Sequence, residues 1–312
     1  MGYDAAMELP SRIEITEVGP RDGLQNESEV VTIEDKVRFI NLLSNAGFRE
    51  IEATSFVRPA WVPQLGDADQ VMARIDRNRE VIYSVLAPNT VGLDNALAAG
   101  ADKIAVFTAA SETFAQKNTN ATIDETITRF TSMVRTAIDA GCPVRAYVSC
   151  AVACPYEGRI DPNRVREVVE RLQEIGVTEI DLGETIGVAV PTDIDRLYEA
   201  LEPVIPAENT VLHLHDTRGT ALACAFRAMQ IGVSRFDASC GGLGGCPYAP
   251  GAAGNLATED LVYLAHGMGI ETGIDLDRLI EAGRHICDVL GRRLPGRVFN
   301  AALAACEPNE SP

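Results

Sequence analysis

The feature that most constrains the fold of this chain is a regular alternation of short, β-rich apolar runs with amphipathic helical stretches. Helical patterns such as 161–176 and 191–205 separate these runs. Alternation of this kind requires a parallel sheet with right-handed crossover connections. The predicted strands lie at 12–18, 50–56, 81–87, 102–110, 143–151, 179–184, 210–216 and 235–242. Capping residues begin several of the helical patterns, at Thr32, Thr122 and Asp161.

Two α/β folds fit such an alternation, a barrel and a doubly wound sheet. A doubly wound sheet carries a G-x-G-x-x-G fingerprint after its first strand, whereas "GPRDGLQNE" follows the first strand here. We therefore predict an α/β fold of the (β/α)8 TIM barrel type, which is compatible with 312 residues. We expect one catalytic domain over 1–312, with the barrel at about 12–270 and a C-terminal helical extension at about 271–312.

Charge and hydropathy limit the partners of this chain. Its formal net charge of −18 argues against nucleic acid and anionic membranes, so an anionic substrate would require a locally basic pocket. No apolar run approaches the roughly 18 residues of a membrane span, and the first residues have no apolar signal core. The eight cysteines, spread over a large chain, are typical of reduced thiols. We expect a cytoplasmic protein.

Polar residues cluster where the predicted strands end. In a (β/α)8 barrel these carboxyl ends build the active site, so the residues found there are the candidates for catalysis and binding. They are Arg21, Asp22, Glu52, Tyr147, Asp181, Glu184, His213 and His215, followed by a glycine-rich loop that carries Cys246 and Asn255.

The segment "HLHD" predicts a metal site, because His213 and His215 on one strand point to the same side. Asp22 and Asn255 are brought near them at the barrel mouth. Two imidazoles with oxygen ligands suit Mg²⁺ or Mn²⁺, with zinc as the less favoured ion. Arg21 is expected to diverge from its neighbour Asp22 and to face an anion instead.

Other thiols and the glycine-rich loop have simpler interpretations. Cys150 and Cys154 have the spacing of a metal pair, but no second pair or nearby histidine supports structural zinc. The loop "GGLGGCPYAPGAAGN" at 241–255 combines permissive glycines with one thiol, Cys246. On composition alone it reads as a surface loop with an incidental cysteine.

Seven separated segments resemble one family. They are "EVGPRDGLQNE", "IEATSFV", "ASETFAQKN", "YVSCAVACPYEG", "TIGVAVP", "HLHDT" and "GGLGGCPYAPGAAGNLATEDLVY". Together they resemble the 3-hydroxy-3-methylglutaryl-CoA lyases, within the barrel metallolyase superfamily that includes isopropylmalate and homocitrate synthases. The resemblance extends from about residue 12 to residue 290.

The resemblance implies a metal-dependent carbon–carbon lyase that cleaves this acyl-CoA to acetyl-CoA and acetoacetate. Arg21 matches the residue that stabilises the developing enolate or carbonyl oxygen, Glu52 a supporting acid, and Cys246 the acid/base thiol of a closing loop. It also implies a homodimer or higher oligomer, and a place in leucine degradation and ketone-body formation. The matching metal ligands are Asp22, His213, His215 and Asn255.

Three positions depart from the family pattern. Asp181 replaces a serine, Glu184 an aspartate and Arg218 a tyrosine. We expect these residues to line the substrate site and Asp181 to form an ion pair with Arg218 that reshapes the wall near the acyl tail. The alternatives are therefore the same chemistry on another 3-hydroxyacyl-CoA, a condensing acyltransferase of the superfamily, and a barrel that binds a ligand without turnover.

Overall fold

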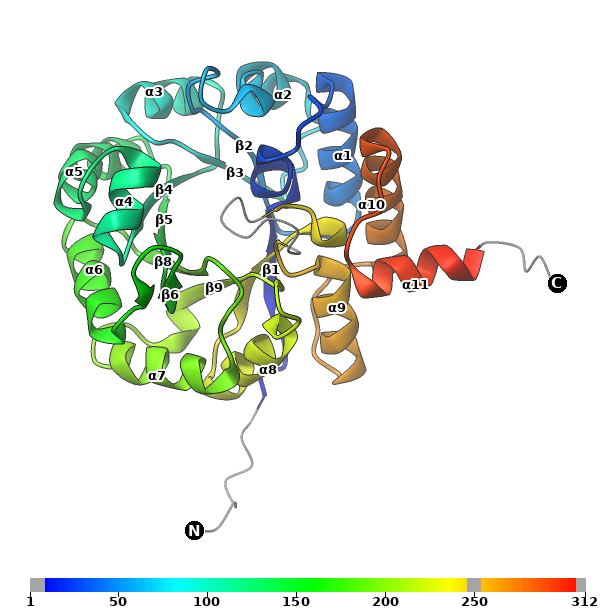
Figure 1. Ribbon diagram of the computed structural model, residues 1–312. Helices are drawn as coiled ribbons and strands as arrows, with labels where there is room; N and C mark the ends of the chain where they lie inside the picture. Colours follow the sequence, from blue (N-terminus) through cyan, green and yellow to red (C-terminus); the bar gives the residue numbers. More distant parts are fainter. Residues whose placement is uncertain (1–8, 246–253, 307–312) are drawn as a thin grey trace, which may run out of the picture.

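Eight parallel strands form a closed barrel in the computed structural model, which describes residues 9–245 and 254–306 (Figure 1). Around the barrel the order is β1-β10-β9-β8-β5-β4-β3-β2, so the first strand pairs with the last. The strands are β1 (Glu14–Glu17), β2 (Glu50–Ser55), β3 (Ile82–Leu86), β4 (Lys103–Ala109), β5 (Val144–Ser149), β8 (Glu179–Glu184), β9 (Thr210–Leu214) and β10 (Arg235–Ala238). The predicted TIM barrel is confirmed, and the doubly wound alternative is wrong.

Helices surround the barrel on its outside (Figure 1). Three of them begin where the sequence predicts, because the side chains of Thr32, Thr122 and Asp161 each accept a hydrogen bond from a backbone N–H of the first turn. The helices are α1 (Ile33–Asn45), α2 (Ala68–Arg74), α3 (Thr90–Ala98), α4 (Glu112–Thr119), α5 (Ile123–Asp139), α6 (Pro162–Glu174), α7 (Pro191–Leu201), α8 (Ala221–Ile231), α9 (Thr258–Gly267), α10 (Leu276–Leu290) and α11 (Arg297–Cys306).

Two local features were not predicted from the sequence. A short antiparallel hairpin of β6 (Ala153–Cys154) and β7 (Gly158–Arg159) follows β5. Directly after β1, the segment η1 (Gly19–Gly23) forms a single π-helical turn. π-Helical turns are rare and are frequent at functional sites, and this one carries Arg21 and Asp22.

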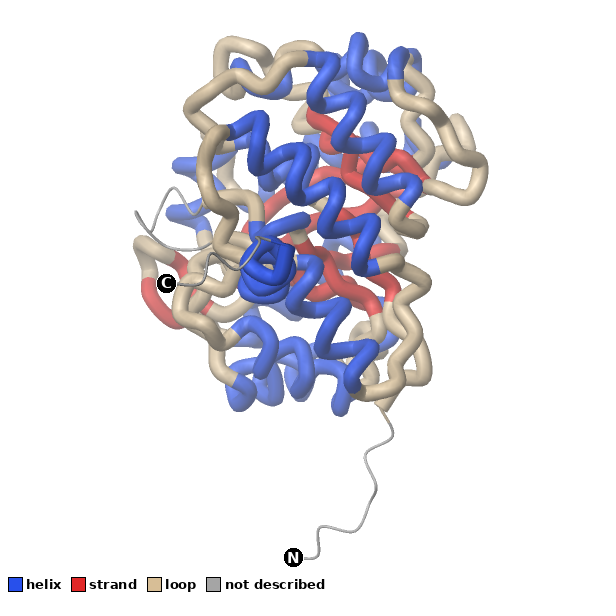
Figure 2. Tube along the Cα trace, turned by 90° about the vertical axis from the view of Figure 1, so that its right-hand side faces the viewer, coloured by secondary structure: helices blue, strands red, loops and turns tan. Residues whose placement is uncertain are grey.

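The apolar core lies between the strands and the surrounding helices. Phe39 and Leu43 of α1, for example, are fully buried, as are Val165 and Leu172 of α6. The C-terminal helices continue this layer outside the barrel, where α10 packs against α1 and α11 contacts α9. Figure 2 shows α11 nearly end-on beside the longer helices. Within the described ranges, no helix is both long and apolar enough to cross a membrane.

Candidate active site at the barrel mouth

Three side chains at the carboxyl end of the barrel are close enough to share one metal ion. Asp22 comes from η1, His213 from β9, and His215 from the residue just after that strand. One ligand atom from each lies within 4.8 Å of the other two. The two imidazole centroids are 5.2 Å apart, as the i, i+2 spacing on a strand predicts. The sequence prediction that these three residues meet is therefore correct.

Asn255 completes this group from the far end of the chain. Its backbone forms a β-bridge with His215, and its Nδ2 donates to Asp22 Oδ2 at 2.8 Å and to the carbonyl of Leu243 at 3.0 Å. Asn255 Oδ1 and His215 Nδ1 are buried without a hydrogen-bond partner of standard geometry among the described residues. Buried acceptors left open in this way fit a divalent cation with nitrogen and oxygen ligands.

The protonation states of these groups suit a cation. Burial alone would raise the pKa of Asp22, but Arg21 and the two histidines lower it to about 2. Burial and the neighbouring His213 lower the pKa of His215 to about 4. At neutral pH Asp22 is therefore an anion and His215 is a neutral imidazole, the forms in which both side chains bind metals.

Arg21 lies beside the metal group and is itself buried. Its Nη1 is 2.6 Å from Asp22 Oδ1 and its Nε is 2.5 Å from Glu52 Oε2. The expectation that Arg21 and Asp22 diverge is wrong, because the π-helical turn brings their side chains together. The guanidinium also lies 5.4 Å from the ring centroid of Tyr147. Burial raises the pKa of Glu52, although Arg21 opposes this.

A large cavity of about 1160 Å³ opens over these residues. Arg21, Asp22, Tyr147 and both histidines lie on its wall. Farther along the wall are Arg58, Trp61, Asn118 and Arg129, so the described part of the lining holds three arginines and one acid. This is the locally basic pocket that an anionic substrate requires in so acidic a chain. The hydroxyl of Tyr147 is buried without a partner among the described residues, as a substrate contact would be.

The three positions that depart from the family pattern lie elsewhere. Asp181 is fully buried inside the barrel, and its ion-pair contact is with Arg145 Nη1 at 3.6 Å. Arg218 is exposed and donates to the carbonyls of Ile186 and Gly187. The predicted Asp181–Arg218 ion pair is therefore wrong, because a strand position fixes the side of the sheet but not the depth in the barrel.

Glu184 is buried and is not among the described residues that line the cavity. Its carboxylate accepts a hydrogen bond from the backbone N–H of Val188 at 3.1 Å, and burial raises its pKa. Glu184 and Arg218 thus both hold the loop that follows β8. Asp181, Glu184 and Arg218 are absent from the described cavity wall, so their expected contacts with substrate remain predictions.

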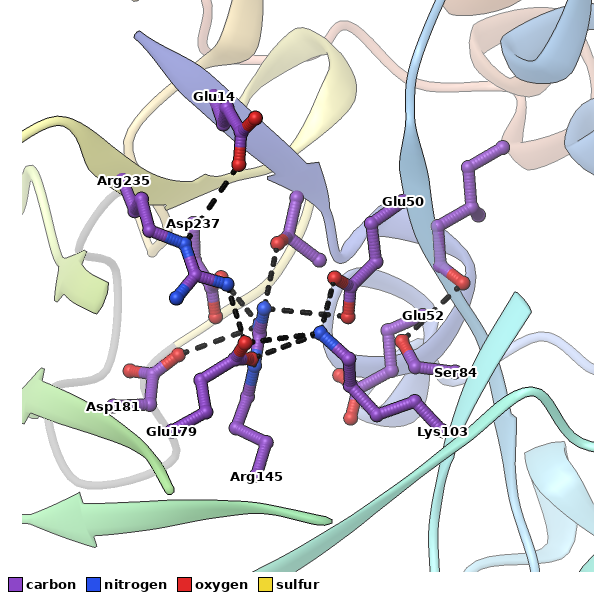
Figure 3. A network of polar contacts seen from close by, with 12 residues as sticks. Glu14, Glu50, Glu52, Ser84, Lys103, Arg145, Glu179, Asp181, Arg235 and Asp237 are labelled. Atoms are coloured by element: carbon purple, nitrogen blue, oxygen red, sulfur yellow. Dashed lines mark hydrogen bonds and ion pairs between the residues drawn. The ribbon is translucent and has the colours of Figure 1, made fainter. Parts of the chain in front are cut away.

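Sequence reasoning missed a network of charged residues inside the barrel, which Figure 3 shows. Arg145 of β5 is at its centre and contacts Glu50 at 3.2 Å, Asp237 at 3.0 Å and, more closely, Glu179. Lys103 binds Glu50 at 2.6 Å. The available signal was the i, i+2 spacing of polar residues in otherwise apolar strands, as at Glu179 and Asp181.

Two buried glutamates hold the turns that surround the site. Glu17 Oε1 accepts hydrogen bonds from the backbone N–H groups of Gly19 and Cys240, both at 2.8 Å. Glu259 accepts from the N–H of Gly241. Burial raises the pKa of Glu17 to about 8 and that of Glu259 to about 7. These turns lead into the segment with Cys246, which lies outside the described residues.

Comparisons with known proteins agree on one family. The HMGL-like family model matches residues 12–286. A mitochondrial hydroxymethylglutaryl-CoA lyase from Pongo abelii is 50% identical over 94% of this chain and 90% of that protein. A cytoplasmic 3-hydroxy-3-methylglutaryl-CoA lyase from Danio rerio is 49% identical over 94% and 88%. The crystal structure of hydroxymethylglutaryl-CoA lyase from Pseudomonas aeruginosa has a TM-score of 0.94 at 45% identity, covering 96% of this chain and 99% of that one.

Proposed function

The chain belongs to the HMGL-like family, and from this premise we propose that it is a lyase that cleaves 3-hydroxy-3-methylglutaryl-CoA to acetyl-CoA and acetoacetate. The observation that carries the proposal is the group of Asp22, His213 and His215 at the base of an arginine-lined cavity. In this retro-Claisen reaction the hydroxyl loses its proton and a carbon–carbon bond breaks. The bonding electrons pass to the thioester as an enolate, which then takes up a proton to give acetyl-CoA.

A divalent metal would be held by Asp22, His213, His215 and Asn255. The two open buried acceptors, His215 Nδ1 and Asn255 Oδ1, support this set. A divalent ion supplies Lewis-acid polarisation of substrate oxygen atoms. The oxygen-rich ligand set favours Mg²⁺ or Mn²⁺.

Arg21 would bind the thioester oxygen on which negative charge develops. It is held in place by Glu52 and Asp22, so it needs little reorganisation as the charge forms. Glu52 would act as the supporting acid that fixes the guanidinium, and His213 would contribute to catalysis as a metal ligand. Tyr147, with its unpartnered hydroxyl on the cavity wall, would contact the acyl group.

The outer cavity has the chemistry to bind the coenzyme A part of the substrate. Arg58 and Arg129 are cations suited to phosphate groups, and Trp61 offers an aromatic face that is 63% exposed. The case for a different 3-hydroxyacyl-CoA depended on an Asp181–Arg218 ion pair, which the structure does not contain. We therefore propose 3-hydroxy-3-methylglutaryl-CoA as the substrate.

The experiment that tests this function is release of acetyl-CoA from a small panel of 3-hydroxyacyl-CoAs. The methylglutaryl compound should be cleaved with the highest kcat/KM. Exhaustive chelation should abolish the activity, and Mg²⁺ or Mn²⁺ should restore it. Undiminished turnover by metal-free protein would contradict the four assigned ligands. Failure to release acetyl-CoA from any member of the panel would contradict the lyase assignment.

Cys246 is proposed as the proton carrier of the reaction. The described residues on either side of its segment, Gly245 and Gly254, adjoin the site: Gly245 lies on the cavity wall and Gly254 accepts a hydrogen bond from the N–H of Asp216. Cys246→Ala should lower kcat by roughly 10²- to 10⁴-fold, the usual contribution of a general acid or base, without changing metal content. Cys287→Ala, at a cysteine outside the site, is the matched control. Near-full turnover of Cys246→Ala would make that thiol a bystander.

We propose a single catalytic domain, assembled as a homodimer or higher oligomer, acting in the cytoplasm in leucine degradation and ketone-body formation. Relatives named mitochondrial and cytoplasmic both exist, so localisation of a tagged chain is the measurement that separates these compartments. Light scattering of the purified protein measures the oligomeric state.

A further inference from the structure

The imidazole of His213 contacts a carboxylate that the reaction itself does not use. Asp237 of β10 lies opposite His213 in the register of the two strands, and its Oδ2 is 3.3 Å from His213 Nδ1. A carboxylate at this nitrogen holds the proton on Nδ1 and leaves the Nε2 lone pair for a metal. The contact therefore fixes both the tautomer and the orientation of the ring.

Asp237 is held in turn by the interior of the barrel. It is 1% exposed, and its Oδ1 accepts from Arg145 Nη1 at 3.0 Å. The same guanidinium donates to Thr16 at 3.0 Å and pairs with Glu50 and Glu179. Figure 3 shows these side chains converging from different strands. His213 is thus connected through Asp237 to a rigid group at the centre of the barrel.

Asp181 lies on the other side of this pair. No N–H or O–H donor among the described residues forms a hydrogen bond to either of its oxygens, and Arg145 Nη1, at 3.6 Å from Oδ2, also contacts Asp237 at 3.0 Å. Two carboxyl groups form a hydrogen bond only when one of them carries a proton. Burial and the charge of Asp237 raise the pKa of Asp181 well above its ordinary value.

The balance of charge inside the barrel leads to the same result. Four buried or nearly buried acids, Glu50, Glu179, Asp181 and Asp237, face three cations, Lys103, Arg145 and Arg235. One acid is in excess when His213 is the neutral imidazole that a metal ligand must be, and an uncompensated charge in such a place is costly. A proton on Asp181 removes the excess.

We propose that Asp237 is a positioning residue that holds His213 for metal binding, and that Asp181 is an un-ionised carboxylic acid that donates a hydrogen bond to Asp237. The inference rests on the proposed function, because it needs the metal site. It gives Asp181 and Asp237 a role although neither lines the cavity.

The test is binding of Mn²⁺ alone to the full chain after metal removal, measured by calorimetry, together with ¹⁵N NMR of the imidazoles. The chain has only four histidines, so the His213 signals are tractable. The wild-type protein should show His213 protonated at Nδ1. Asp237→Asn should weaken Mn²⁺ binding about 10- to 100-fold and should lose that tautomer. Asp181→Asn retains a neutral donor and should weaken binding less than Asp181→Leu, which has none.

Glu50→Gln is the matched control, since Glu50 contacts Arg145 but not Asp237. An equal loss of Mn²⁺ affinity in this control would overturn the positioning role. Wild-type affinity in Asp237→Asn, or a wild-type His213 protonated at Nε2 alone, would also overturn it, and the second measurement requires no variant to fold. Other buried acids, such as Glu17, also keep a proton, so the infrared band of protonated carboxylic acids should lose intensity in Asp181→Asn rather than vanish; an unchanged band intensity would refute the Asp181 assignment.

These outcomes separate the inference from the proposed function. If the wild type binds Mn²⁺ and cleaves substrate while Asp237→Asn binds Mn²⁺ equally well, the inference is wrong and the lyase assignment stands. If the wild type binds no Mn²⁺, the metal site is wrong and both are overturned.

Discussion

The mouth and the interior of the barrel are both rich in charge, but they use it differently. At the mouth, His215 Nδ1, Asn255 Oδ1 and the Tyr147 hydroxyl are buried without partners among the described residues. In the interior, the charges of Arg145 and Lys103 are matched by acids from strands across the barrel. Barrels of this class are typically filled by branched aliphatic side chains, and the charged interior departs from that pattern.

This difference indicates that the polar atoms at the mouth bind a ligand, whereas the ion pairs of the interior stabilise the barrel. Polar atoms left open in a buried site are costly unless something binds them. In the interior, ion pairs match the charges of the cations and hold the side chains in one geometry, and the proton proposed for Asp181 removes the remaining charge. Mutations at the mouth should therefore change function more than stability, and mutations in the interior should do the reverse, except at Asp237, which contacts His213.

The largest effect is expected in the interior. Arg145→Met removes the cation that faces Glu50, Glu179 and Asp237. Removing one partner of a buried ion pair usually costs about 3–5 kcal/mol, so the free energy of unfolding should fall by about that amount in denaturant titration. Arg135→Met, on the exposed face of α5, is the control and should change stability by less than about 0.5 kcal/mol. A loss that small for Arg145→Met would erase the distinction between the two regions.

The same substitution at the mouth should act mainly on catalysis. Arg21→Met should lower kcat by about 10²- to 10³-fold, as for loss of one oxyanion donor. Its stability should fall less than that of Arg145→Met, because Arg21 pairs with two acids and one of them, Asp22, is partly exposed. Steady-state kinetics and denaturant titration on the two variants make the comparison. Equal stability losses with little change in kcat would contradict it.

The last expected effect is a change of slope with pH, and it concerns a buried acid, Glu17, that has no cation beside it among the described residues. Burial raises the pKa of Glu17 from 4.5 to about 8, so the folded state keeps a proton that the unfolded chain loses above pH 4.5. The free energy of unfolding must then fall as pH rises between 4.5 and 8, by about 1.4 kcal/mol per pH unit from this group. Glu17→Gln should flatten that decline, whereas the exposed Glu208→Gln should not. Parallel curves for Glu17→Gln and wild type would refute the assignment.

Local and periodic signals made much of the fold predictable. All eight strands and the caps at Thr32, Thr122 and Asp161 depend on nearby residues, and they were found. The metal group was accessible because the HxH spacing places both imidazoles on one side of a strand that ends at the mouth. The ligand role of that group and the thiol role of Cys246 remain predictions.

The interior network was not predictable in the same way. Glu50, Arg145 and Asp237 come from three strands that are far apart in the sequence, β2, β5 and β10, and only closure of the barrel brings them together. Asp181 is an example. The alternation of side chains along β8 indicates that Asp181 faces the barrel interior, but its depth in the barrel depends on the stagger of neighbouring strands. The unexpected contact of Arg21 with Asp22 has another cause, a π-helical turn with no clear sequence signature.

The pairing of the first barrel strand with the last has a consequence for biosynthesis. Asp22 and Asn255 are 233 residues apart, yet they are hydrogen-bonded across the seam where β1 meets β10. Contacts of such long range form late, because a ribosome releases the chain from its N-terminus and distant segments must first be brought together. A nascent chain that ends before β10 has no seam and no complete ligand set. The ability to hold a cation is therefore acquired only when the ring closes, so an unfinished chain cannot bind the ion at this site.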